Sequence, residues 1–280
     1  MYPIVKKTNI APDVLELEVS APQIVRKAQA GQFMILRVDD LGERIPLTLA
    51  DWDGKRGTIT LIFQEVGAST RKLGALEEGE AILDCVGPLG QQSEIRKYGT
   101  VVCIGGGIGI APIYPIARAQ HEAGNRVISI LGARTKELLF WEEKLRAVSD
   151  EVLVTTDDGS SGRKGFVTDV LKNLVEGGVN VDIAYAIGPV VMMRAVSHLT
   201  LTYGIHTVVS LNPIMMDGTG MCGACRVTVD DKTRFACVDG PEFDGHKVDF
   251  VELMKRQQMY LGQEKEAAQK RECSCSTRNR

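Results

Sequence analysis

The sequence changes its pattern abruptly near residue 98, and this change limits the possible folds more than any other feature. Before it, short β-rich runs end at Gly or Asp, as in "DVLELEV", "GQFMILRVD", "GTITLIFQEVG" and "EAILDCVGPLG". After it, "YGTVVCIGGGIGIAP" leads a buried strand into glycines, and helical and strand patterns then alternate as far as about residue 208. The first pattern predicts a small antiparallel β-barrel, and the second predicts an α/β domain, a parallel sheet with helices on both faces.

The alternating region predicts its elements in order. They are helix 113–124, strand 126–134, helix 136–148, strand 151–159, helix 166–178 and strand 182–189. After residue 208 the chain becomes rich in Gly and Met and holds a cluster of cysteines, which a helical pattern and a charged tail follow. We therefore expect four parts, with bounds at 1–98, 99–208, 209–248 and 249–280.

Charge and hydropathy exclude several classes of protein. The formal net charge of −3 gives no reason to expect a nucleic acid or an anionic membrane surface as partner. The first residues contain no apolar core of signal-peptide length, and no window holds about 18 apolar residues in a row, so we expect neither export nor a membrane span. The expected location is cytoplasmic, where the seven cysteines are reduced thiols or metal ligands.

The glycine-rich segment "CIGGGIGIAP" lies where a predicted strand meets a predicted helix. Glycines let the backbone approach a pyrophosphate, and the helix N-terminus offers free N–H groups and a positive dipole end. The Rossmann fingerprint is not met, because Ile110 stands where the third glycine belongs. A tight packing turn is the alternative interpretation. The candidate nucleotide-binding residues here are Gly105, Gly106, Gly107, Gly109, Ala111 and Pro112.

Three cysteines after residue 221 have the spacing of a metal site. Cys222, Cys225 and Cys237 follow C-x2-C-x11-C, and a plant-type [2Fe–2S] site adds a further ligand four intervening residues upstream. Asp217 occupies that position, and its carboxylate is an anionic oxygen donor, so the predicted ligands are Asp217 and the three cysteines. Zinc is the rival metal, and a turn-capping role is the alternative for Asp217.

Four short motifs occur in a characteristic order, namely "IPLTL" (45–49), "VGASTRKL" (66–73), "GGGIGIAP" (105–112) and "IGPVVMM" (187–193). In this order they resemble the ferredoxin–NADP reductase superfamily over roughly residues 1–208. The resemblance implies that 1–98 form an FAD-binding β-barrel and that 99–208 form an NAD-binding α/β domain. Residues 209–248 would then be a [2Fe–2S] module, and 249–280 a C-terminal helix and polar tail.

On the flavin side, the resemblance gives Thr48 the role of the hydroxyl that hydrogen-bonds flavin N5, which makes it the catalytic candidate. Arg44 stands one residue from the position of the family's pyrophosphate arginine, which is occupied by Ile45. The other FAD-binding candidates are Pro46, Leu47, Gly67, Ala68, Ser69 and Thr70. The alternative is that Thr48 and Ser69 are ordinary strand and turn hydroxyls.

On the nicotinamide side, Asp157 and Asp158 stand near the place where NADP-dependent members often carry a Ser–Arg pair. Carboxylates repel a 2′-phosphate and accept hydrogen bonds from ribose hydroxyls, so NADH is the expected cofactor. Arg134 argues the other way, since an arginine can pair with a 2′-phosphate, and an Asp–Gly turn is the alternative role of the aspartates. The late motif adds the candidates Gly188, Pro189 and Met192.

The cysteine segment, including "CVDGP", resembles the electron-transfer subunit of class B dihydroorotate dehydrogenases. That family normally has cysteine where this chain has Asp217. An Asp-plus-three-Cys pattern with "ERIPLT" resembles more closely the small (alpha) subunit of NADH-dependent reduced ferredoxin:NADP+ oxidoreductase, a family that includes subunits described as sulfide dehydrogenase. Both resemblances imply a chain that carries FAD and [2Fe–2S], uses NAD(H) and works with a larger catalytic subunit.

These features predict an oxidoreductase subunit that passes electrons between NAD(H), FAD and a [2Fe–2S] cluster, to or from a larger partner in a heterodimer or larger complex. The alternatives are the electron-transfer subunit of an NAD-dependent dihydroorotate dehydrogenase, a stand-alone flavin reductase, and a redox sensor or assembly protein without turnover. Cys273 and Cys275 lie in the polar tail, and we expect deletion of 270–280 to leave FAD and iron content intact.

Overall fold

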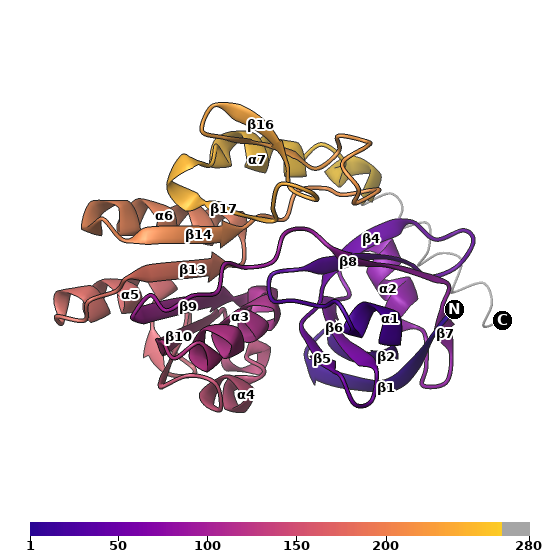
Figure 1. Ribbon diagram of the computed structural model, residues 1–280, viewed down its shortest axis with the longest axis horizontal. Helices are drawn as coiled ribbons and strands as arrows, with labels where there is room; N and C mark the ends of the chain where they lie inside the picture. Colours follow the sequence, from indigo (N-terminus) through magenta and orange to yellow (C-terminus); the bar gives the residue numbers. More distant parts are fainter. Residues whose placement is uncertain (265–280) are drawn as a thin grey trace.

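The computed structural model describes residues 1–264, so the tail cysteines Cys273 and Cys275 lie outside the described residues. The barrel strands are at one end of the molecule, the long parallel sheet is at the other, and the last elements lie across the top of both (Figure 1). No helix within the described part of the chain is long and apolar enough to cross a bilayer.

The first part of the chain forms an antiparallel barrel of two sheets, in the orders β5-β6-β2-β1-β7 and β4-β3-β8. Leu15, Leu17 and Val19 of β2 are buried between the more exposed Glu16 and Glu18, because successive side chains of a strand point to opposite faces. The bounds are β1 (Tyr2–Ala11), β2 (Val14–Ser20), α1 (Pro22–Val25), β3 (Phe33–Arg37), β4 (Arg44–Thr48), β5 (Asp51–Asp53), β6 (Thr58–Gln64), α2 (Ala68–Gly74), β7 (Ala81–Ile82) and β8 (Asp84–Leu89).

The second part forms a seven-stranded sheet in the order β12-β11-β10-β9-β13-β14-β17, with only β17 antiparallel. The bounds are β9 (Thr100–Gly106), η1 (Gly107–Gly109), α3 (Ile110–Glu122), β10 (Arg126–Ala133), η2 (Lys136–Leu138), α4 (Glu142–Arg146), β11 (Glu151–Thr156), β12 (Arg163–Lys164), α5 (Val167–Glu176), β13 (Ile183–Ile187), α6 (Val190–Tyr203) and β14 (His206–Ser210). Together with the barrel, this sheet confirms the predicted fold class.

Helices cover both faces of the parallel sheet. Val101 and Cys103 of β9 pack in the core under α3 and α4, whereas Val102 and Ile104 pack in the core under α5 and α6. The strand order reverses between β9 and β13. In open α/β sheets ligands bind at this reversal point, beyond the carboxyl ends of the strands.

The predicted helix over 136–148 is wrong. The chain forms η2 and then α4, and Trp141 between them adopts a left-handed conformation with φ of 56°. Phe140 is buried, and the Trp141 ring packs edge-on against Tyr114 with centroids 5.3 Å apart. Packing of these aromatic side chains against α3 interrupts the helix that local propensity favours.

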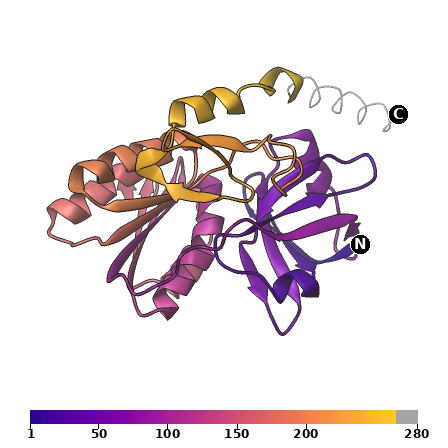
Figure 2. The same cartoon turned by 45° about the horizontal axis from the view of Figure 1, so that its top comes forward.

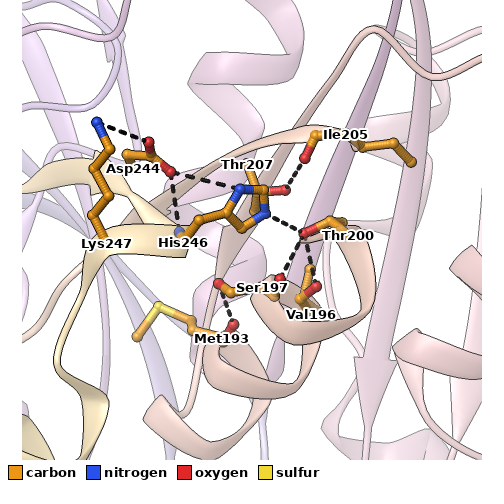
Figure 3. Close-up of polar contacts among 9 residues, drawn as sticks. All are labelled: Met193, Val196, Ser197, Thr200, Ile205, Thr207, Asp244, His246 and Lys247. Atoms are coloured by element: carbon orange, nitrogen blue, oxygen red, sulfur yellow. Dashed lines mark hydrogen bonds and ion pairs between the residues drawn. The ribbon is translucent and has the colours of Figure 1, made fainter. Parts of the chain in front are cut away.

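The segment after β14 is attached to the parallel sheet rather than separate from it. Its elements are β15 (Arg226–Val229), β16 (Lys232–Phe235), β17 (Glu242–Asp244), η3 (Gly245–Lys247) and α7 (Phe250–Gln257), and α7 packs against α6 and β15 (Figure 2). β17 pairs with β14, and His246 Nε2 lies 3.0 Å from Thr200 Oγ1 of α6 (Figure 3). β14 crosses residue 208, and β17 extends the same sheet. The four predicted parts of the chain and their bounds stay a prediction.

Candidate functional site: an interdomain cleft beside a cysteine loop

A cleft of about 990 Å³ lies between the barrel and the parallel sheet, at the ends of β9 and β13. Its walls are largely apolar, with backbone and a few polar side chains exposed in them. Of the predicted site residues, those that line it are Pro46, Leu47, Thr48, Thr70, Gly106, Gly107, Gly109, Ala111, Pro112, Asp157, Gly188, Pro189 and Met192. Those that do not line it are Arg44, Gly67, Ala68, Ser69, Gly105 and Asp158.

Glycine is needed in the 105–112 segment for two different physical reasons. A Cβ on Gly105 would lie 2.9 Å from Ile110 Cα, and one on Gly109 would lie 2.1 Å from the Ile187 carbonyl oxygen. These two glycines therefore serve close packing of α3 against β9 and β13, which is the alternative that the sequence left open. Gly107 has φ of +54° and open space beside it. The backbone at Gly106 and Gly107 thus borders the cleft just before α3, where N–H groups can bind a phosphate.

On the barrel side, Thr48 ends β4 opposite Phe33 of β3, and both residues line the cleft. The Gly67 N–H donates to Thr70 Oγ1 at 3.0 Å, and Ser69 Oγ donates to Glu43 Oε2 at 2.9 Å. These hydroxyls therefore help to shape the start of α2, and only Thr70 of the pair reaches the cleft.

Arg44 lies in β4 opposite Arg37, and it is exposed away from the cleft wall. Its predicted contact with a pyrophosphate stays a prediction.

The two aspartates after β11 differ in their surroundings. Ser160 donates to Asp158 Oδ1 from both its hydroxyl and its backbone N–H, at 2.7 and 2.9 Å, and these bonds lower the pKa of Asp158. Asp158 therefore shapes the turn. Asp157 lines the cleft, and so do Arg134 and Phe166, whose ring is 63% exposed. One aspartate and one arginine, rather than two aspartates, therefore line this part of the cleft.

The cysteine loop lies against the barrel. Cys225 and Cys237 are buried with their sulfurs 3.2 Å apart, and Cys222 is exposed. Gly220 donates its N–H to Cys237 Sγ at 3.1 Å. Gly218 has φ of +80°, and a Cβ there would lie 2.7 Å from Ile35 Cγ1, so the loop fits closely onto β3.

Asp217 precedes the cysteines in the same loop. Its Oδ2 accepts hydrogen bonds from the N–H groups of Met221 and Cys222, both at 3.2 Å, and its Oδ1 accepts one from Thr219. The Thr219 hydroxyl and these N–H groups lower the pKa of Asp217, so it is an anion in the turn-capping role that the sequence left open.

The donor set fits an iron–sulfur cluster in chemistry. Two facing thiols are buried among apolar groups, and burial raises the pKa of Cys237 to about 12. A bound metal stabilises such buried sulfurs as thiolates, and an N–H aimed at a sulfur is typical of the groups around a cluster. Within residues 1–264, however, no three His, Cys, Asp or Glu side chains converge in a metal-binding arrangement. The four-ligand set of Asp217, Cys222, Cys225 and Cys237 therefore remains a prediction.

The sequence analysis did not identify some of the residues that line the cleft. They include Phe33, Gln64, Phe166, Asn212 and Met215. Phe166 could have been suspected, as an apolar residue directly after a glycine at a helix start. The others come from strands and loops whose proximity only the fold establishes.

A barrel joined to a sheet with a cleft at its reversal point, and a cysteine loop beside that cleft, define an electron-transfer reductase. Two family models match the chain, the oxidoreductase NAD-binding domain at residues 103–198 and the iron–sulfur cluster binding domain of dihydroorotate dehydrogenase B at 212–249. The chain belongs to the family of dihydroorotate dehydrogenase B electron transfer subunits and their homologues.

Three relatives define this placement. The chain is 50% identical to a dihydroorotate dehydrogenase B electron transfer subunit homologue of Thermotoga maritima, over 94% of this chain and 92% of that one. It is 36% identical to the electron transfer subunit of Shouchella clausii, over 86% and 94%. A solved structure of NADH-dependent reduced ferredoxin–NADP oxidoreductase aligns with 48% identity and a TM-score of 0.92, over 96% of this chain and 97% of that chain.

A more distant structure, phthalate dioxygenase reductase, shares the fold with 17% identity and a TM-score of 0.61. The two family models and the structure at 48% identity confirm the predicted resemblance, the oxidoreductase class and the cofactor set of FAD, [2Fe–2S] and NAD(H).

Proposed function

We propose that the chain is the electron-transfer subunit of an NADH-dependent ferredoxin:NADP+ oxidoreductase, working with a larger flavin and iron–sulfur partner subunit. The observation that carries the proposal is that the cleft and the buried cysteines share side chains between them. Phe33 and Met215 line the cleft, and the same two side chains pack in one buried cluster with Cys225 and Cys237. A cofactor in the cleft and a metal in the cysteine loop would therefore be separated by about one layer of side chains.

The chain's residues have distinct tasks in this proposal. Thr48 and Leu47, which line the barrel side of the cleft, would hold the flavin ring, and the backbone at Gly106 and Gly107 would hold the nicotinamide nucleotide. When bound, FAD takes two electrons from a nicotinamide and can release them singly, which suits a one-electron cluster. The apolar walls keep water from the reacting groups. The four predicted ligands would hold [2Fe–2S], and Cys222 among them is exposed and so accessible to a partner.

Iron analysis and reduction by NADH test the proposal. The purified protein should contain FAD and about two irons per chain, and its visible absorbance should bleach when NADH is added. One zinc without iron, or a flavin that NADH does not reduce, would refute it. A pull-down from native extract should recover a larger flavin and iron–sulfur protein.

We expect NADH to be preferred over NADPH, and this preference now rests on Asp157 alone. Its carboxylate can accept hydrogen bonds from ribose hydroxyls and repels a 2′-phosphate. The kcat/KM with NADH should exceed that with NADPH by at least about tenfold, roughly 1.4 kcal/mol. Asp157→Asn should reduce the preference, whereas Asp158→Asn, the matched control at the turn, should preserve it. Equal use of both cofactors by the natural protein, or a preference for NADPH, would reject this assignment and point to Arg134 instead.

A second candidate is the electron-transfer subunit of an NAD-dependent dihydroorotate dehydrogenase. The match of residues 212–249 to that enzyme's iron–sulfur domain favours it. Recovery of a dihydroorotate-oxidising partner in the pull-down would support this candidate over the first. We also propose a cytoplasmic location, since thiolate ligands need a reducing compartment.

A further inference from the structure

A single carboxylate joins the barrel to two helices of the parallel-sheet half. Asp51 of β5 accepts a hydrogen bond from Arg118 Nη1 of α3 at 2.6 Å and another from Lys144 Nζ of α4 at 2.8 Å. The exposed fractions of these side chains are 18% for Asp51, 23% for Arg118 and 38% for Lys144. This partly shielded triad is screened less by salt than an ion pair in open solvent.

Aromatic rings enclose the two cations of the triad. The Arg118 guanidinium lies 4.9 Å from the centroid of Trp52, and Lys144 Nζ lies 3.8 Å from the centroid of Trp141. Tyr114 lies between them, 5.3 Å from Arg118 and 4.8 Å from Lys144. Such contacts add attraction between a cation and a ring face, so each cation is held on two sides.

The surrounding contacts also cross between the halves. Trp141 Nε1 donates to Glu16 Oε2 of β2 at 2.8 Å. The core around α3 includes barrel side chains, namely Ala11, Val14, Ala30, Ala50 and Ile62. The triad therefore lies at the edge of a continuous packed interface and can fix the angle between the two halves.

Each member of the triad is connected to a wall of the cleft. Asp51 directly follows Ala50 and the Thr48 end of β4, which line the barrel side. Arg118 lies on α3, about 12 Å along the helix from its first residue, which follows the glycine segment. Lys144 lies on α4, just after the cleft-lining Phe140. One carboxylate thus holds the flavin-side wall against both segments of the nicotinamide-side wall.

We propose that Asp51 is a positioning residue that sets the distance and angle between the two walls of the cleft, and thereby the rate of flavin reduction. This inference rests on the proposed function. In the reaction NADH loses a hydride, that is two electrons and one proton, and becomes NAD+, while the flavin gains the same. Because a shift of about 1 Å between reacting groups can cost about 100-fold in rate, loss of the triad should slow this step.

Asp51→Asn removes the charge that holds both cations and keeps the size of the side chain. The experiment measures the rate of flavin reduction at saturating NADH, the Kd for NADH, FAD and iron content, and hydrogen exchange of residues 110–122. We expect reduction to slow by about 10- to 100-fold, the Kd to change by less than about threefold, cofactor content to stay normal, and exchange in 110–122 to rise. Asp51→Glu should restore part of the rate.

Asp84→Asn is the matched control, because Asp84 accepts hydrogen bonds from Arg37 at 2.6 and 2.9 Å wholly within the barrel. In this variant NADH should reduce the flavin at the normal rate. If Asp51→Asn folds poorly, Lys144→Met retains the Arg118 pair and should give a smaller slowing with normal cofactor content.

Three outcomes would overturn the inference: a normal rate in Asp51→Asn, an equal loss in Asp84→Asn, or a loss of rate that only matches loss of FAD. Failure of the natural protein to be reduced by NADH would instead refute the proposed function. In that case the exchange of 110–122 still decides whether Asp51 holds the two halves together.

Discussion

We expect Glu242 to couple the stability of the protein to pH, so that its replacement raises stability in alkaline solution. It lies in β17 opposite Ser210 of β14, and it accepts a hydrogen bond from Ser93 Oγ at 2.6 Å. Ser93 belongs to the segment that links the barrel to the parallel sheet, and it is buried. Burial raises the pKa of Glu242 from its ordinary value of 4.5 to about 7, against the opposing effect of the Ser93 hydrogen bond.

The sign of the effect follows from proton binding. Between pH 4.5 and 7 the native protein holds a proton on Glu242 that the unfolded chain has lost, so stability falls as pH rises through this window. The cost of ionising Glu242 in the folded protein is complete above pH 7. It corresponds to about 3 kcal/mol at pH 8 and about half of that at pH 5.5.

Glu242→Gln should remove this cost, because its amide oxygen can still accept the Ser93 hydrogen bond but cannot ionise. At about 2 °C per kcal/mol for a chain of this size, Tm should rise by about 6 °C at pH 8 and about 3 °C at pH 5.5. The assay is thermal unfolding of the cofactor-loaded protein at both pH values, with FAD and iron content checked at each. Glu122→Gln, at an exposed site on α3, is the control, and its effect on Tm should be the same at both pH values. A Tm gain that is equal at both pH values, or a loss at pH 8, would refute the argument.

Three further predictions concern the cysteine loop. Asp217→Ala should make the cluster labile to chelators, whereas Asp217→Cys should keep it and lower its reduction potential, because thiolate donates more charge than carboxylate; an unaltered spectrum in the alanine variant would place the fourth ligand elsewhere. Gly218→Ala places a Cβ against Ile35 at a φ of +80°, so the free energy of unfolding should fall by about 2 kcal/mol or more, and Tm and iron content should fall with it. Normal Tm and iron content would contradict the close fit of the loop onto β3. Arg256→Met removes the hydrogen bond from Arg256 Nη2 to the Ala224 carbonyl, 3.1 Å long, and should speed iron release by about 2- to 10-fold; release at the natural rate would show that α7 does not brace this loop.

Local patterns in the sequence were enough to predict the fold class. A period of two in "DVLELEV" and the strand, glycine and helix succession around Gly107 depend on neighbours within a few residues. The C-x2-C spacing and the ordered flavin and nicotinamide motifs are local in the same sense. The prediction failed over 136–148 because Trp141 packs on Tyr114 of another helix, and tertiary packing outweighs the small preference of each residue for a helix.

Local sequence patterns thus predicted the fold class, the order of most elements and the spacing of the candidate ligands in the cysteine loop, because each depends on residues close together in the chain. Which side chains meet depends on the fold as a whole. Asp51 lies 67 residues from Arg118 and 93 from Lys144, and Met215 reaches both the cleft and the buried cysteines. Folding brings such residues together through burial of the two halves against each other, a contribution summed over the whole interface. No short stretch of sequence records that sum, so the geometry of the cleft had to come from the structure.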